Sequence, residues 1–82
     1  METVKDLLPG DRARITGFKP GEEGYRSRLL SMGLTKNTEF TLVKVAPLGD
    51  PVELELRGFK LSLRKAEAEV LQIERCGRRE GK

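Results

Sequence analysis

Residues 52–63, VELELRGFKLSL, decide the fold of this chain. Apolar and polar residues alternate through VELEL and again through LSL, and a period of two is typical of strands with one buried face. Gly58-Phe59 stands between the two runs and is predicted to form the tip of a tight hairpin, because glycine accepts the backbone conformations that such turns require. The stretch therefore predicts two antiparallel strands joined by a short turn.

Further strands are predicted before this hairpin. Residues 12–18 alternate with a period of two, which places Ala13 and Ile15 on the inward face. Residues 39–46 alternate as well, but the phase slips at Leu42-Val43. A slip of one residue in a strand indicates a β-bulge or a sharp bend.

One short helix is predicted over residues 25–32. Tyr25, Leu29 and Met32 repeat at the spacing of a helical face, and no β-branched residue interrupts the segment. Gly33 follows directly and is suited to the left-handed conformation that ends many helices. A helix this short needs packing against a sheet to be stable.

The two ends of the chain complete the expected fold. Val4, Leu7 and Leu8 can anchor the N-terminal segment, while residues 65–68 suit a helical turn and residues 70–73 a closing strand. About five short strands and one short helix predict a mainly β fold, a small SH3-like barrel, with an OB-type barrel as the nearest alternative.

The charge distribution argues against a broad nucleic-acid-binding surface. The chain has 82 residues, with 16 Lys and Arg against 13 Asp and Glu. The net charge of +3 is carried by residues 75–82, so the rest of the chain is neutral. Nucleic-acid-binding proteins usually present a basic face or stripe. We therefore expect a folded domain over residues 1–75, a disordered basic tail over residues 76–82, and no nucleic-acid partner.

Most catalytic chemistry is also disfavoured. The chain has no His, which is the side chain that titrates near neutral pH without perturbation, and it has no phosphate-binding loop motif. Cys76 is the single cysteine. We expect no catalytic residues and no required cofactor, and the metal-binding residues stay unknown. The carboxylates considered as metal ligands are expected to be solvated charges. They are Glu22, Glu23, Glu67, Glu69 and Glu74.

No run of apolar residues is long enough to cross a bilayer, and no secretion signal is evident at the N-terminus. We therefore expect a cytoplasmic protein that does not insert into the membrane.

Several strings together resemble the FeoA family of bacterial ferrous iron transport. The most specific is APLGDP at residues 46–51, and the resemblance extends over residues 7–73. The other matching pieces are residues 15–18, 25–26, 28–34 and 61–65, with Ala68. The resemblance implies an SH3-like barrel that cooperates with FeoB, a membrane transporter with a cytoplasmic G-protein domain, in moving Fe²⁺ inward. It also implies possible recruitment of the protein to the inner membrane face. Transient binding of Fe²⁺ or another divalent metal is left open, although the ligand content gives it no support.

A domain without catalytic groups is expected to act by contact with another protein. On the predicted helix, either Leu29, Leu30 and Met32 together pack on the barrel, or one flank with its arginines forms a contact patch. The rigid turn at residues 47–51 offers a second surface, with an exposed leucine at its tip. The candidate partner-binding residues are Arg26, Leu29, Leu30, Met32, Leu48 and Asp50. A metal-sensing regulatory domain, a nucleic-acid-binding module and a weak homo-oligomer remain alternatives.

Overall fold

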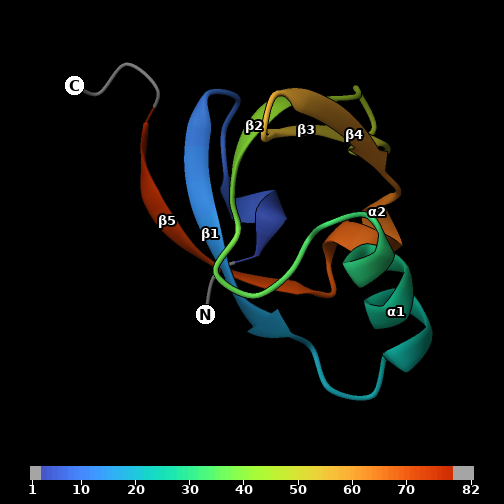
Figure 1. The fold of residues 1–82 in the computed structure, drawn as a ribbon. Helices are drawn as coiled ribbons and strands as arrows, with labels where there is room; N and C mark the ends of the chain where they lie inside the picture. Colours follow the sequence, from blue (N-terminus) through green and yellow to red (C-terminus); the bar gives the residue numbers. More distant parts are fainter. Residues whose placement is uncertain (1–2, 79–82) are drawn as a thin grey trace.

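Five antiparallel strands form one curved sheet in the order β4-β3-β2-β1-β5 (Figure 1). The computed structural model describes residues 3–78. The strands are β1 (Asp11–Phe18), β2 (Glu39–Val45), β3 (Val52–Leu56), β4 (Phe59–Leu63) and β5 (Leu71–Arg78). The helical segments are the 3₁₀ helix η1 (Val4–Asp6), α1 (Glu23–Ser31) and α2 (Lys65–Ala68). Figure 1 shows α1 and α2 next to each other at one end of the sheet.

The core fills the concave face of the sheet. Its members are the inward side chains of the strands, together with apolar residues from η1, α1 and α2. Ala13 and Ile15 are completely buried, as predicted from the alternation in β1. Val4 and Leu7 are buried as well, but the prediction that Leu8 anchors the N-terminal segment is wrong, because this side chain is 57% exposed. The main chain of Leu8 is instead bonded to Asp11, which leaves the side chain outside the core.

The predicted irregularity in β2 is confirmed. The pairing between β2 and β3 shifts between Leu42 and Lys44, at the point where the alternation slips in the sequence. Leu42 is buried, whereas Val43 is half-buried. A bulge increases the local bend of a strand, so this position contributes to the curvature of the sheet.

The β3–β4 hairpin is confirmed, with its turn one residue earlier than predicted. Leu56 pairs with Phe59, so the two loop residues are Arg57 and Gly58. Both have positive φ, 51° and 86°. This is the combination that a type I′ turn requires, and its twist matches that of the flanking strands. Phe59 consequently belongs to β4 and is 47% exposed.

The helix α1 begins two residues before the predicted start and ends at Ser31, one residue before the predicted end, and the predicted glycine follows its C-cap Met32. Gly33 has a φ of 94°, and its N–H donates to the carbonyl of Leu30. The N–H of Leu34 reaches back to the carbonyl of Leu29 at 3.0 Å. These two bonds define a Schellman motif, and the accompanying apolar contact joins Leu29 and Leu34, both completely buried.

Strand β5 is longer than predicted. Its pairs with β1 continue through Arg12 with Gly77 and Asp11 with Arg78. The predicted start of a disordered tail at Cys76 is therefore wrong for residues 76–78, because main-chain pairing extends the strand where no large apolar side chain signals it. The part of that prediction concerning residues 79–82 lies outside the described residues.

Candidate protein-contact surface

The helix α1 divides its two adjacent leucines between the core and the surface. Leu29 is completely buried, and Met32, just beyond the helix, packs partly buried against the core. Leu30, about 100° further round the helix, is 38% exposed. The prediction of Leu29 as a partner-binding residue is therefore wrong, since its side chain is completely buried in the core. Leu30 is the leucine that a partner could reach.

Leu30 lines a groove between α1, the end of β1 and the loop that joins them. The groove has a volume of about 540 Å³. Arg26 lies on the same side of α1, and its guanidinium carbon is 5.7 Å from the centre of the Phe18 ring. This distance is within the range of a cation–π interaction. The ring and Leu30 supply the apolar part of the groove.

Three cations line this groove: Lys19, Arg26 and Lys36. Within residues 3–78, none of them forms an ion pair with a carboxylate. Two carboxylates, Glu22 and Glu23, also line the groove, at the N-terminal end of α1, where the helix dipole stabilises negative charge. The groove thus combines an apolar centre with cations that, in the part of the chain that the structure describes, form no ion pair.

The turn between β2 and β3 forms a second exposed surface. Leu48 is 91% exposed at its tip. Asp50 is also exposed, and its Oδ1 accepts a hydrogen bond from the N–H of Lys65 at 3.1 Å, which ties the turn to the start of α2. Asp50 lines a cavity of about 400 Å³ with Arg28 of α1. Arg28 projects from the opposite flank of α1 to Arg26 and Leu30, so the predicted residues form two surfaces separated by the helix.

The chain matches the FeoA domain model over residues 3–75. It belongs to the FeoA family. A curated relative, the Fe(2+) transport protein A/Fe(2+) transporter FeoB fusion protein of Porphyromonas gingivalis, is 34% identical over 71 residues. This match covers 87% of the present chain and 8% of the fusion protein. FeoA is thus linked to Fe²⁺ transport, and in this relative it is joined to FeoB.

Solved structures agree with the family assignment. The FeoA-like protein of Clostridium acetobutylicum has a TM-score of 0.81 at 32% identity, covering 90% of this chain and 85% of that one. The zinc-complexed FeoA of Stenotrophomonas maltophilia, described as a prokaryotic SH3 domain protein, has a TM-score of 0.76 at 21% identity. It covers 90% of this chain and 91% of that one and supports the fold alone. The predicted mainly β, SH3-like fold is confirmed.

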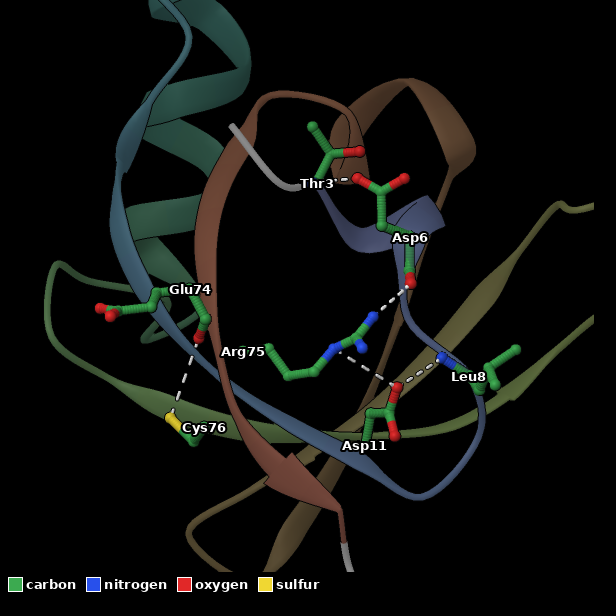
Figure 2. Close-up of polar contacts among 7 residues, drawn as sticks. All are labelled: Thr3, Asp6, Leu8, Asp11, Glu74, Arg75 and Cys76. Carbon is green, nitrogen blue, oxygen red and sulfur yellow. Dashed lines mark hydrogen bonds and ion pairs between the residues drawn. The ribbon is translucent and has the colours of Figure 1, made fainter.

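A polar cluster at the opposite end of β1 from the groove has a structural role in this FeoA-family chain. Figure 2 shows the guanidinium of Arg75 between the main-chain carbonyl of Asp6 and the carboxylate of Asp11. Asp11 is buried and also accepts the N–H of Leu8 at 2.9 Å. Arg75, the last residue of the predicted folded domain, thus uses its charge to join β5 to η1 and to the start of β1.

The carboxylates considered as metal ligands have different surroundings from one another. Glu67 is 5% exposed, so the expectation of a solvated charge is wrong for this residue. It accepts the N–H of Arg64 at 3.0 Å and pairs with Arg28, which joins α2 to α1. Glu74 pairs with Arg14 across β5 and β1. Across residues 3–78, no three His, Cys, Asp or Glu side chains are grouped in a way that could hold a metal ion.

Cys76 lies on β5, with its thiol directed toward the carbonyl of Glu74 at 3.8 Å (Figure 2). Desolvation raises the pKa of this thiol, and the nearby carboxylate of Glu39 raises it further. A raised pKa disfavours the thiolate, which is the reactive form of cysteine.

None of the helices described over residues 3–78 combines the length and apolar character needed to cross a bilayer.

Proposed function

We propose that this chain is an accessory protein of ferrous iron uptake that acts by contact with a FeoB-type membrane transporter. The observation that carries the proposal is the relative in which a FeoA part and a FeoB part occur in one polypeptide. Fusion of two domains maintains a high local concentration of each near the other, which favours a function that depends on their contact. In the present protein the same contact would recruit the domain to the transporter at the cytoplasmic face of the membrane.

The groove beside α1 is the contact surface that we propose. Leu30 and Phe18 supply apolar area, and Arg26 supplies a guanidinium next to it. Arginine and large apolar side chains in a concave site commonly carry much of the binding energy of an interface. Leu48, on the separate surface across α1 from the groove, is a second candidate anchor that needs little ordering, because its turn is already tied to α2 through Asp50.

The proposed role is non-enzymatic and requires no resident cofactor. Fe²⁺ is the cargo of the transporter in this account. The domain would influence transport by docking, by altering nucleotide hydrolysis in the G-protein domain, or by assisting assembly of the transporter.

Affinity capture of the transporter from the same genome tests the proposal. The full-length transporter and its soluble G-protein domain are captured separately on the immobilised chain. Leu30→Gln is expected to weaken capture by about tenfold, corresponding to a loss of roughly 1.4 kcal/mol of binding free energy. Leu8→Gln is the matched control, because Leu8 is an exposed leucine before the start of β1, whereas the groove lies at its end.

Capture of the full-length transporter but not of the G-protein domain would locate the contact on the membrane part. Capture of neither one by the wild-type chain would refute the proposed function.

A further inference from the structure

The end of β1 carries an open strand edge inside the groove. Strand β1 pairs with β5 from Asp11 to Phe18, but its pairs with β2 stop at Arg14. The last main-chain bonds on the β2 side are made by Ile15, with Thr38 and Asn37. In Figure 1 the segment that joins α1 to β2 crosses β1 in this view. The end of β1 continues past this crossing, with α1 opposite it.

The hydrogen-bonding direction at this edge follows from the pairing with β5. The N–H of Lys19 donates to the carbonyl of Val70 at 2.8 Å, which is a bond on the β5 side. In an antiparallel ladder, consecutive residues direct their main-chain groups to opposite sides. The N–H and C=O of Phe18 are therefore directed away from β5. Thr16, Gly17 and Phe18 all line the groove, so this edge faces it.

We propose that the groove binds an extended acidic peptide segment of the partner by strand addition to residues 16–18 of β1. The inference rests on the proposed contact with a FeoB-type transporter and specifies its form. An unpaired edge is a template for an added strand, in which main-chain bonds supply affinity and side-chain pockets supply specificity. Here the added strand would lie between β1 and α1.

Charge determines which peptide fits. The groove cations Lys19, Arg26 and Lys36 have no ion-pair partner within residues 3–78. A segment with Asp or Glu at alternate positions would place carboxylates beside these cations, because side chains on one face of a strand recur every second residue. An apolar residue on the opposite face would contact Leu30 and the ring of Phe18. We expect a segment that alternates acidic and apolar residues.

The probe is a set of short overlapping synthetic peptides that cover the cytoplasmic sequence of the transporter, titrated into the ¹⁵N-labelled chain. We expect one acidic segment to bind and to protect the amide of Phe18 from hydrogen exchange. N-methylation along that peptide should weaken binding about tenfold at every second residue and little at the residues between, because a strand directs alternate N–H groups to its neighbour. Lys36→Glu should weaken binding, whereas Lys60→Glu on β4, outside the groove, serves as the matched control.

Each other outcome overturns the inference. A peptide that binds with consecutive N-methylation-sensitive positions, or with an unprotected Phe18 amide, excludes strand addition and leaves the proposed function intact. Binding of the whole transporter without binding of any peptide also excludes an extended segment as the ligand. Absence of binding to both transporter and peptides refutes the inference and the proposed function together.

Discussion

Replacing Leu29 with alanine is expected to lower the free energy of unfolding by about 3 kcal/mol, within the range measured for buried leucines in other proteins. Leu29 is completely buried and also contacts Leu34 in the motif that ends α1. A domain of this size has a total stability of roughly 4 to 12 kcal/mol, so the loss is a large fraction of it. The melting temperature should fall by roughly 12 to 24 °C.

Thermal and urea unfolding followed by circular dichroism measure this effect. Leu30→Ala is the matched control, because it removes the same atoms one position along the same helix from a side chain that is 38% exposed. The control should cost less than about 1 kcal/mol. Equal losses of stability in the two variants would refute the assignment of Leu29 to the core and Leu30 to the surface.

Three further predictions concern other parts of the chain. Glu67→Ala should destabilise the domain by about 2 kcal/mol in urea unfolding, because Glu67 is a buried carboxylate that accepts a main-chain N–H. Arg28→Ala should cost less than about 1 kcal/mol, because this side chain is largely solvated, and equal costs for the two variants would contradict this reasoning. Arg57→Asn should raise the free energy of unfolding by roughly 0.5 to 1 kcal/mol, since asparagine tolerates the positive φ of this turn better, and a loss of stability would count against the type I′ assignment. The rate of Cys76 alkylation by iodoacetamide, measured from pH 7 to pH 10, should rise with a midpoint pH above that of a free cysteine. Glu39→Gln should lower this midpoint pH by removing a negative charge. An unchanged midpoint pH in that variant would exclude the electrostatic effect.

The hairpin and the bulge could be predicted because each depends on local sequence. Alternation over residues 52–63 reports which face of each strand is buried, and the phase slip at Leu42-Val43 reports the bulge directly. The end of α1 is similarly local, since Gly33 followed by an apolar residue is sufficient to predict the motif. These features involve few competing arrangements.

The length of β5 and the buried charges could not be predicted, because they depend on contacts between distant residues. Cys76 and the two residues after it extend a strand through main-chain bonds to β1, which apolar periodicity does not reveal. Arg75 and Asp11 are far apart in sequence and meet only when β1 and β5 pair. Neither residue carries a local signal of its partner, and nothing local signals the burial of Asp11.

The groove that we propose as a contact surface could be predicted in part. The pattern of α1 indicated that one flank is exposed, and the structure selects the flank with Arg26 and Leu30. The contributions of Phe18 and Lys36 could not be foreseen, because the two residues come from β1 and from the segment after α1. Helical periodicity alone also could not decide between Leu29 and Leu30, because either could have faced the sheet.

The central claim is tested most directly by calorimetric titration. The purified chain is titrated into the full-length FeoB-type transporter from the same genome, which is held in lipid nanodiscs. The account predicts saturable binding that Leu30→Gln weakens by about tenfold while the melting temperature of the chain stays unchanged. Absence of binding by the folded wild-type chain, or equal binding by the wild type and a folded Leu30→Gln variant, would contradict it.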